Sequence, residues 1–123
     1  MKRIVITGEK GGIGKSTLAA LLTEYLNFKN KRVNVVDSDP LQITGNYLDR
    51  CSKKGRVVDN KLDFEYQIID TPGCSGPSIT YIQNADLILV PFISQYADCQ
   101  VIIPWFASLH PRLQKKVVFI PNR

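Results

Sequence analysis

Residues Gly8 to Thr17 read GEKGGIGKST, and no other part of this 123-residue chain is as informative. The segment follows the apolar run Ile4–Ile6 and precedes residues with helical apolar spacing that begin at Lys15. Glycines let the backbone fold tightly and turn successive N–H groups toward one point, and the positive N-terminus of a following helix strengthens that anion-binding nest. The segment therefore predicts a phosphate-binding loop between a strand and a helix.

The side chains of this loop have distinct expected tasks. Lys15 supplies a positive charge for the β and γ phosphates, the Ser16 hydroxyl is placed to bind Mg²⁺, and Thr17 lines the α-phosphate side. The backbone groups around the phosphates belong to Gly11, Gly12, Ile13 and Gly14. The strict pattern GxxxxGK[ST] is not met, because its first glycine would fall at Glu9. The match is to KGGxGK[ST]T, the deviant Walker A form, in which Lys10 is an additional signature lysine.

Five short apolar runs end in polar or turn residues and are expected to be strands. They are Arg3–Thr7, Arg32–Asp37, Tyr66–Asp70, Asp86–Pro91 and Lys116–Pro121. Their apolar residues are continuous rather than alternating, which is typical of parallel strands covered on both faces.

Helical spacing is expected between these runs. The candidates are residues 15–28, 41–51, 77–83 and 97–109. Pro104 is expected to kink or restart the last helix, and the His110-Pro111 pair is expected to end it. Alternating strands and helices predict an α/β three-layer sandwich, with a parallel sheet between helices and one domain over residues 1–123.

Three acidic residues follow predicted strands. Asp37 ends the second run and Asp39 lies two residues beyond it, and Asp70 heads an Asp-Thr-Pro-Gly stretch that ends at Gly73. Because open parallel sheets bind ligands at the carboxyl ends of their strands, these carboxylates are expected near the phosphate loop. They make sense there if a metal ion lies between them and the phosphates, with the Gly73 N–H contacting the γ-phosphate. The alternative is that each carboxylate only caps the next helix or turn.

Composition is that of an ordinary globular protein, with 44% apolar and 22% charged residues. No apolar run approaches the ~20 residues of a membrane span, and no signal peptide is recognisable, so a cytoplasmic protein is expected. Three cysteines, Cys51, Cys74 and Cys99, show neither a disulfide framework nor a metal-binding spacing. The net charge is +5, and residues 50–61 carry five basic residues against one acidic residue. That segment is a candidate DNA contact, or else a solvated loop.

Together these motifs resemble the ParA/MinD family of deviant Walker A ATPases, in particular plasmid and chromosome partition proteins. The resemblance rests on the Walker A box at Lys10–Thr17, the DxDP box at Asp37–Pro40 and the IIDTPG box at Ile68–Gly73. The run Ala85–Pro91 and the final strand that ends in Asn122-Arg123 are also similar to this family.

The resemblance implies ATP and Mg²⁺ as ligands, a sheet ordered 2-3-1-4-5 and an ATP-dependent homodimer. Lys10 would reach the partner's nucleotide, Asp39 would orient the attacking water, and Asn122 would contact adenine. Asp70 would hold Mg²⁺ through water, and Ser16 and Asp37 complete the expected metal site. Slow hydrolysis would switch a DNA-bound or membrane-bound dimer to a released form, with a ParB-like partner stimulating turnover.

Departures from the family leave other functions open. The chain ends directly after a strand, so the C-terminal helices are expected to be missing, and no amphipathic membrane helix is found. A truncated domain that binds nucleotide without hydrolysing it is one alternative. A biosynthetic ligase or small-molecule kinase, which has no use for Lys10, is another. An electron-transfer protein like the nitrogenase iron protein is disfavoured, because Cys74 lies too near Asp70 and Cys99 lacks a glycine-rich setting.

Overall fold

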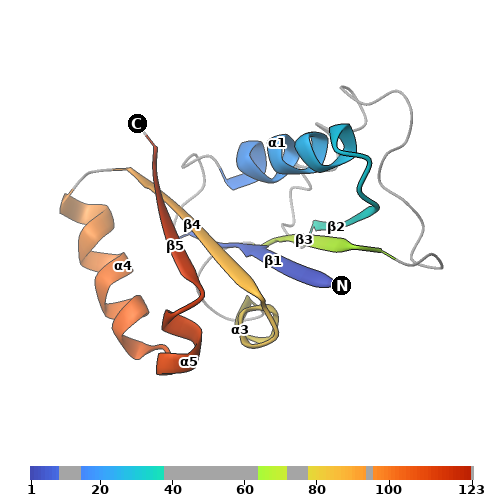
Figure 1. Cartoon of the computed structure of the whole chain (residues 1–123). Coiled ribbons are helices and arrows are strands. Elements are labelled where there is room, and N and C mark those ends of the chain that lie inside the picture. Colours follow the sequence, from blue (N-terminus) through green and yellow to red (C-terminus); the bar gives the residue numbers. More distant parts are fainter. Residues whose placement is uncertain (9–14, 38–63, 72–77, 94–95, 123) are drawn as a thin grey trace.

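The computed structural model describes residues 1–8, 15–37, 64–71, 78–93 and 96–122 (Figure 1). Its five strands are β1 (Lys2–Ile6), β2 (Val33–Asp37), β3 (Tyr66–Asp70), β4 (Leu87–Ile93) and β5 (Val117–Asn122). They form one sheet in the order β2-β3-β1-β4-β5, and every adjacent pair is parallel. The parallel sheet and its strand order are therefore confirmed, with strand bounds shifted by only a few residues.

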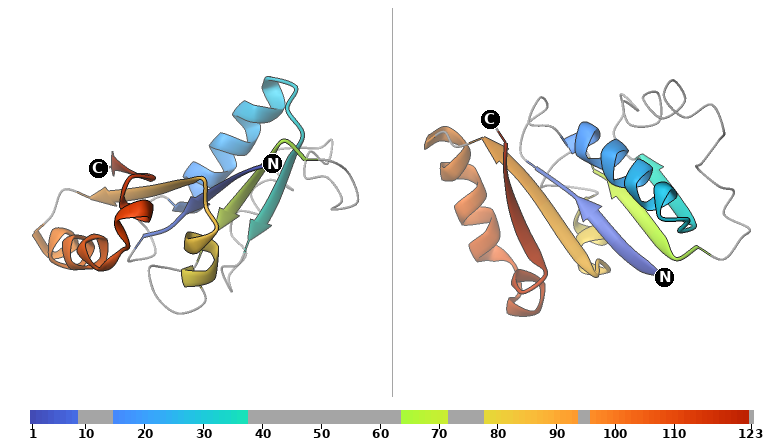
Figure 2. Two further views of the ribbon diagram at one scale, coloured as in Figure 1. Left: turned by 60° about the horizontal axis from the view of Figure 1, so that its bottom comes forward. Right: turned by 45° about the horizontal axis from the view of Figure 1, so that its top comes forward.

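The helices lie on both faces of this sheet (Figures 1 and 2). They are α1 (Lys15–Phe28), α3 (Ser78–Gln83), α4 (Tyr96–Ser108) and α5 (Pro111–Gln114). Helix α1 covers one face, and α3, α4 and α5 lie on the other, which confirms the three-layer arrangement. The helix expected over residues 41–51 lies outside the described residues.

Two apolar clusters fill the spaces between these layers. In β1, Ile4 and Ile6 pack into the cluster beneath α1, whereas Val5 packs into the cluster beneath α3 and α5. Side chains of successive strand residues point to opposite faces, so a strand covered on both faces must be apolar at every position. This explains why the strand sequences are continuous apolar runs.

Only some of the apolar residues of α1 face the sheet. Ala19, Thr23 and Leu26 are buried, while Leu21 and Tyr25 are exposed. The small side chains of Ala19 and Thr23 let the helix approach the sheet, and the Thr23 hydroxyl donates to the Ala19 carbonyl at 2.8 Å. Burial on this helix therefore follows side-chain size at the contact as well as hydrophobicity.

The end of α1 has a specific local cause. Asn30 adopts a positive φ of 60°, the left-handed conformation that asparagine tolerates better than most residues. The Lys31 N–H donates to the Leu26 carbonyl at 2.9 Å, and the Asn30 N–H donates to the Asn27 carbonyl at 2.9 Å. These two bonds form a Schellman motif, which satisfies helix carbonyls and turns the chain back toward β2.

Pro104 and the His110-Pro111 pair lie in the C-terminal helical region. Helix α4 continues through Pro104 without a restart. Pro104 and Gln100 are both exposed, so the Gln100 carbonyl that loses its helical donor lies where water can hydrate it. Helix α4 ends at Ser108, just before the His110-Pro111 pair that was expected to end it. The His110 side chain accepts a hydrogen bond from the Arg112 N–H and caps a separate one-turn helix, α5.

Candidate nucleotide-binding site

The carboxyl ends of β1 and β3 are joined by hydrogen bonds from the residues that follow the strands. The Thr71 N–H and hydroxyl both donate to the Ile6 carbonyl, at 3.1 and 2.9 Å. The Thr7 N–H donates to the Leu89 carbonyl of β4 at 3.0 Å. Thr7 and Thr71 are both fully buried, so this edge has a fixed geometry.

Lys15 connects the start of α1 to this edge. Its ammonium donates a buried hydrogen bond of 3.0 Å to the Thr71 carbonyl, and only 5% of the residue is exposed. A buried ammonium group is costly unless polar groups surround it, so a lysine kept here indicates that the site is built to hold an anion beside it. The N-terminus of α1, a helix of 14 residues, lies at the same edge and adds partial positive charge.

Asp70 supplies the negative component of the site. It is the last residue of β3, is fully buried, and immediately precedes Thr71, which accepts the Lys15 hydrogen bond. The β2–β3 register pairs Asp37 with Asp70, so two of the three predicted carboxylates lie on adjacent strands at equivalent positions. The structure thus brings the backbones of these two residues together at the predicted edge.

These residues fit a magnesium ion by the chemistry of their donors. A buried carboxylate needs a positive partner, and carboxylate and hydroxyl oxygens are the ligands that Mg²⁺ prefers. Asp70 and Ser16, which lies in the first turn of α1, would hold the ion, and Asp37 lies on the next strand. Among the described residues no three His, Cys, Asp or Glu side chains cluster as a ready-made metal site.

Several predicted site residues lie outside the described part of the chain, namely Lys10, Gly11, Gly12, Ile13, Gly14, Asp39 and Gly73. Ser16, Asp37 and Asn122 have described backbones in α1, β2 and β5, but their side chains are not described. Thr17 is exposed on the first turn of α1.

Sequence reasoning gave Thr71 no task, although it lies inside the Asp-Thr-Pro-Gly stretch. Its carbonyl receives Lys15, and its hydroxyl ties β3 to β1. The sequence does show a hydroxyl residue directly after a predicted strand. This pattern could have indicated the role of Thr71, because such residues often form hydrogen bonds to neighbouring backbone groups.

No helix among the described residues is long and apolar enough to cross a membrane. Cys99, on α4, is a free thiol.

Curated relatives match parts of the chain. An iron–sulfur cluster carrier protein of Rickettsia bellii is 47% identical over 38 residues, which is 31% of this chain and 12% of that protein. The sporulation initiation inhibitor protein Soj of Bacillus subtilis is 31% identical over 103 residues, which is 76% of this chain and 40% of Soj. The chain therefore spans less than half the length of either relative.

Solved structures share the fold. MinD in the MinC:MinD cell division complex of Aquifex aeolicus superposes with a TM-score of 0.78 at 20% identity, covering 100% of this chain and 69% of that chain. A structure described as a plasmid partition protein of Borrelia burgdorferi B31 bound to AMPPNP gives 0.71 at 18% identity, with coverages of 99% and 76%. Cobyrinic acid a,c-diamide synthase of Mycobacterium smegmatis, with bound ADP and magnesium, gives 0.72 at 16% identity, with coverages of 98% and 73%.

The CobQ/CobB/MinD/ParA nucleotide binding domain matches residues 4–123, almost the whole chain. The order of the parallel strands and the buried lysine at the start of α1 agree with that match. This chain belongs to the CobQ/CobB/MinD/ParA family of P-loop nucleotide-binding domains.

Proposed function

We propose that this protein is an ATP-binding switch of the ParA type that hydrolyses ATP slowly and acts in plasmid or chromosome partition or in related DNA mobilisation. The observation that carries the proposal is the buried Lys15 ammonium, held 3.0 Å from the Thr71 carbonyl beside Asp70. The similarity to Soj over 76% of the chain and the fold shared with a plasmid partition protein support it.

In this proposal the residues of the carboxyl edge bind and orient the nucleotide. Lys15 moves from the Thr71 carbonyl to the β and γ phosphates, and the exchange of one hydrogen-bond partner for a charged one favours binding. The glycine-rich residues 11–14 present backbone N–H groups, and the N-terminus of α1 adds its dipole. Asn122, at the end of β5, contacts adenine.

Hydrolysis depends on positioning and charge stabilisation, as is general for phosphoryl transfer. Asp39 orients the attacking water, and Lys10 of a second copy stabilises charge on the transferred group. Asp70, Ser16 and Asp37 would hold Mg²⁺, which when bound would supply positive charge to offset that of the phosphates. ATP-dependent homodimerisation, a ParB-like activating partner and non-specific DNA contact are parts of the same proposal.

The test is ATP binding and turnover by the purified chain with Mg²⁺, with and without duplex DNA, alongside molecular mass in ATP and in ADP. The proposal expects micromolar ATP binding that requires Lys15, slow turnover, and a dimer in ATP only. A protein that turns over ATP only with a small-molecule acid or amine as co-substrate would instead be a ligase or kinase of the same family.

A further inference from the structure

The described charges separate strongly between the two ends of the sheet. Eight of the nine described lysine and arginine residues lie at, or shortly before, the amino end of a strand. We call this set the basic edge: Lys2, Arg3, Lys29, Lys31, Arg32, Arg112, Lys115 and Lys116. Two acidic residues, Glu65 and Asp86, lie among these cations. Elsewhere the described residues include one basic residue, Lys15, and four acidic residues. The basic edge is thus opposite in sign and position to the rest of the described chain.

Backbone hydrogen bonds hold the basic edge together as a continuous row. Glu65 N–H donates to the Arg32 carbonyl at 2.9 Å, and Lys2 N–H donates to the Glu65 carbonyl at 3.0 Å. Asp86 N–H donates to the Arg3 carbonyl at 2.8 Å, and farther along Ile88 N–H donates to the Lys116 carbonyl at 2.9 Å. The row therefore crosses all five strands, a span of roughly 19 Å at ~4.8 Å per strand.

The two acidic residues in the row have structural tasks. Glu65 accepts a hydrogen bond of 3.0 Å from the Arg32 N–H, and Asp86 accepts one of 2.8 Å from the Arg3 N–H. The hydrogen bond from the Arg3 N–H lowers the pKa of the Asp86 carboxyl. The nearby charges of Lys2, Lys116 and Arg3 lower this pKa further, whereas burial raises it. Both acidic side chains are thus bound to backbone N–H groups of the basic edge.

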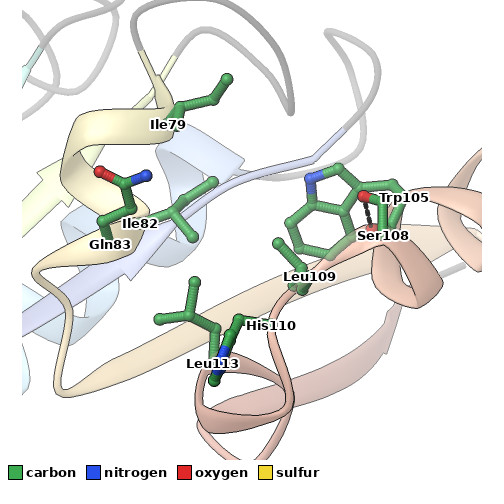
Figure 3. A pocket seen from close by; sticks show the side chains of 8 residues that line it. All are labelled: Ile79, Ile82, Gln83, Trp105, Ser108, Leu109, His110 and Leu113. Carbon is green, nitrogen blue, oxygen red and sulfur yellow. Dashed lines mark hydrogen bonds between the residues drawn. The ribbon is translucent and has the colours of Figure 1, made fainter.

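A pocket of ≈ 290 Å³ lies between α3 and the α4–α5 region (Figure 3). Ile79 and Ile82 of α3 form one wall, and Trp105 and Leu109 at the end of α4 face them. Leu113 of α5 also lines the pocket. Its volume is just below the ~300–1,000 Å³ of pockets that enclose small-molecule ligands. This space is large enough for one large apolar side chain.

Polar side chains also line this pocket. Gln83, Ser108 and His110 line it, and the His110 Nδ1 atom accepts a hydrogen bond of 3.1 Å from the Arg112 N–H. That bond leaves the Nε2–H of the neutral ring as a donor. Arg112 and Lys115 are exposed, and they lie one residue before and two residues after Leu113 in the chain. Two exposed cations are therefore close in the chain to a residue that lines the pocket.

A second pocket of ≈ 370 Å³ lies on the other side of α3. Arg3, Gln67, Ile69 and Tyr81 contribute to its lining, and Arg3 Nε donates to Gln67 Oε1 at 3.3 Å. Helix α3 thus lies between two pockets, and Arg3 of the basic edge lines the second of them.

We propose that the apolar pocket between α3 and α4–α5, with the exposed Arg112 and Lys115 next to its lining residues in the chain, docks an acidic segment of a partner protein that inserts one large apolar side chain. This surface goes beyond the proposed function, since no nucleotide-binding residue belongs to it. The pocket selects the class of partner. A DNA backbone would use the cations and leave the apolar walls unused, and a membrane surface inserts protruding apolar groups rather than filling a hollow.

Trp105 is the single tryptophan of the chain and lines the pocket, so its fluorescence reports occupancy directly. The probe is a short synthetic peptide of glutamates around a central leucine–phenylalanine pair, titrated into the whole protein. We expect a saturable change in Trp105 emission that a glutamate peptide with a central serine pair does not produce. Equal responses to both peptides would overturn the proposal.

Two matched pairs of variants test the site. Ile79→Ser should weaken peptide binding about fivefold, which corresponds to about 1 kcal/mol. Leu21→Ser on α1 is the control and should leave the peptide affinity unchanged. The two residues are similarly exposed, at 51% and 55%. Arg112→Glu should weaken peptide binding about tenfold. Lys31→Glu makes the same change of charge near β2 and should weaken peptide binding less than twofold. Circular dichroism confirms folding of each variant.

The competing classes of partner are separate arms of the titration. Duplex DNA and phosphatidylserine vesicles should neither reproduce the Trp105 change nor displace the peptide at 150 mM salt. Displacement by either, or equal losses in both members of a variant pair, would assign the surface to general charge attraction. ATP binding, measured in the same samples, separates a failure of this site from a failure of the proposed nucleotide function.

Discussion

The Lys15 ammonium and the Thr71 carbonyl, 56 residues apart in sequence, form a buried hydrogen bond of 3.0 Å at the carboxyl edge of the sheet. The bond exists because β3 lies next to β1, so that the residue after β3 meets the first residue of the helix that follows the phosphate loop. It gives Lys15 a polar partner in an otherwise buried position and keeps its charge at the candidate nucleotide site.

Replacing Lys15 should therefore remove most nucleotide affinity. A charged hydrogen bond contributes about 1.5–3 kcal/mol, so Lys15→Ala is expected to weaken ATP binding about 10- to 150-fold by calorimetry. Lys29→Ala, at the exposed end of the same helix, is the control and should change the dissociation constant less than twofold. An unchanged affinity in Lys15→Ala would contradict the phosphate-loop assignment.

Lys10 and Asp39 distinguish a sandwich dimer from a generic P-loop enzyme, although both lie outside the described residues. Lys10→Ala and Asp39→Ala should each keep ATP affinity within a few fold and lose turnover, because both act on the transferred phosphate rather than on the bound ground state. Asp39→Ala should also accumulate an ATP-bound dimer in light scattering. If Lys10→Ala hydrolyses ATP at the parent rate, the sandwich-dimer mechanism is wrong and a ligase or kinase is favoured instead.

The basic segment of residues 50–61, also outside the described residues, is the candidate DNA contact. Neutralising Lys53, Lys54 and Arg56 should flatten the dependence of DNA affinity on salt, since each phosphate contact contributes about 0.9 to the logarithmic slope. The matched control neutralises Lys2, Lys29 and Lys31 of the basic edge, and it should leave the slope unchanged. Identical slopes for the parent and the first variant would return the segment to a solvated loop.

Ile88 tests the core between the sheet and α3. It is fully buried on β4, so Ile88→Ala should lower the free energy of unfolding by about 2–5 kcal/mol. Ile103→Ala, on α4 with 64% of the residue exposed, should lower it by less than about 0.5 kcal/mol. Urea denaturation of both variants measures these changes. Comparable losses of unfolding free energy in the two variants would contradict the assignment of Ile88 to the core.

Asp86 predicts a pH effect of defined sign. Its pKa is lowered in the folded protein, first by the Arg3 N–H hydrogen bond, so the charged form is stabilised by folding. That contribution is present above the ordinary carboxyl pKa of about 3.9 and is lost as the pH falls through the lower folded value. It should stay below about 1 kcal/mol, because Asp86 is exposed.

The measurement is the difference in unfolding free energy between the parent and Asp86→Asn. The difference should be constant from pH 5 to 7 and shrink below about pH 4. A difference that grows on acidification would have the wrong sign for this account.

Local sequence was sufficient for much of the architecture. Continuous apolar runs predict parallel strands because both faces of each strand are covered, and the spacing after Lys15 predicts a helix that the structure bounds at Phe28. The glycine-rich segment predicts a phosphate loop because only glycine permits that close approach of successive N–H groups. The α/β class and the location of the candidate site follow from such short-range rules.

Tertiary packing decided what short-range rules leave open. Ala19, Thr23 and Leu26 of α1 face the sheet rather than Leu21 and Tyr25, since the fit between helix and sheet selects which side is buried. The passage of α4 through Pro104 likewise depends on the exposure of that turn.

Local sequence patterns also did not predict the contacts between residues that are distant in the sequence. Thr71 receives Lys15, and Trp105 faces Ile79, only because the strand order brings residues from separate helices and strands together. A sequence pattern records the periodicity of one element, whereas a site or pocket is the sum of side chains from several elements whose relative positions are fixed by packing.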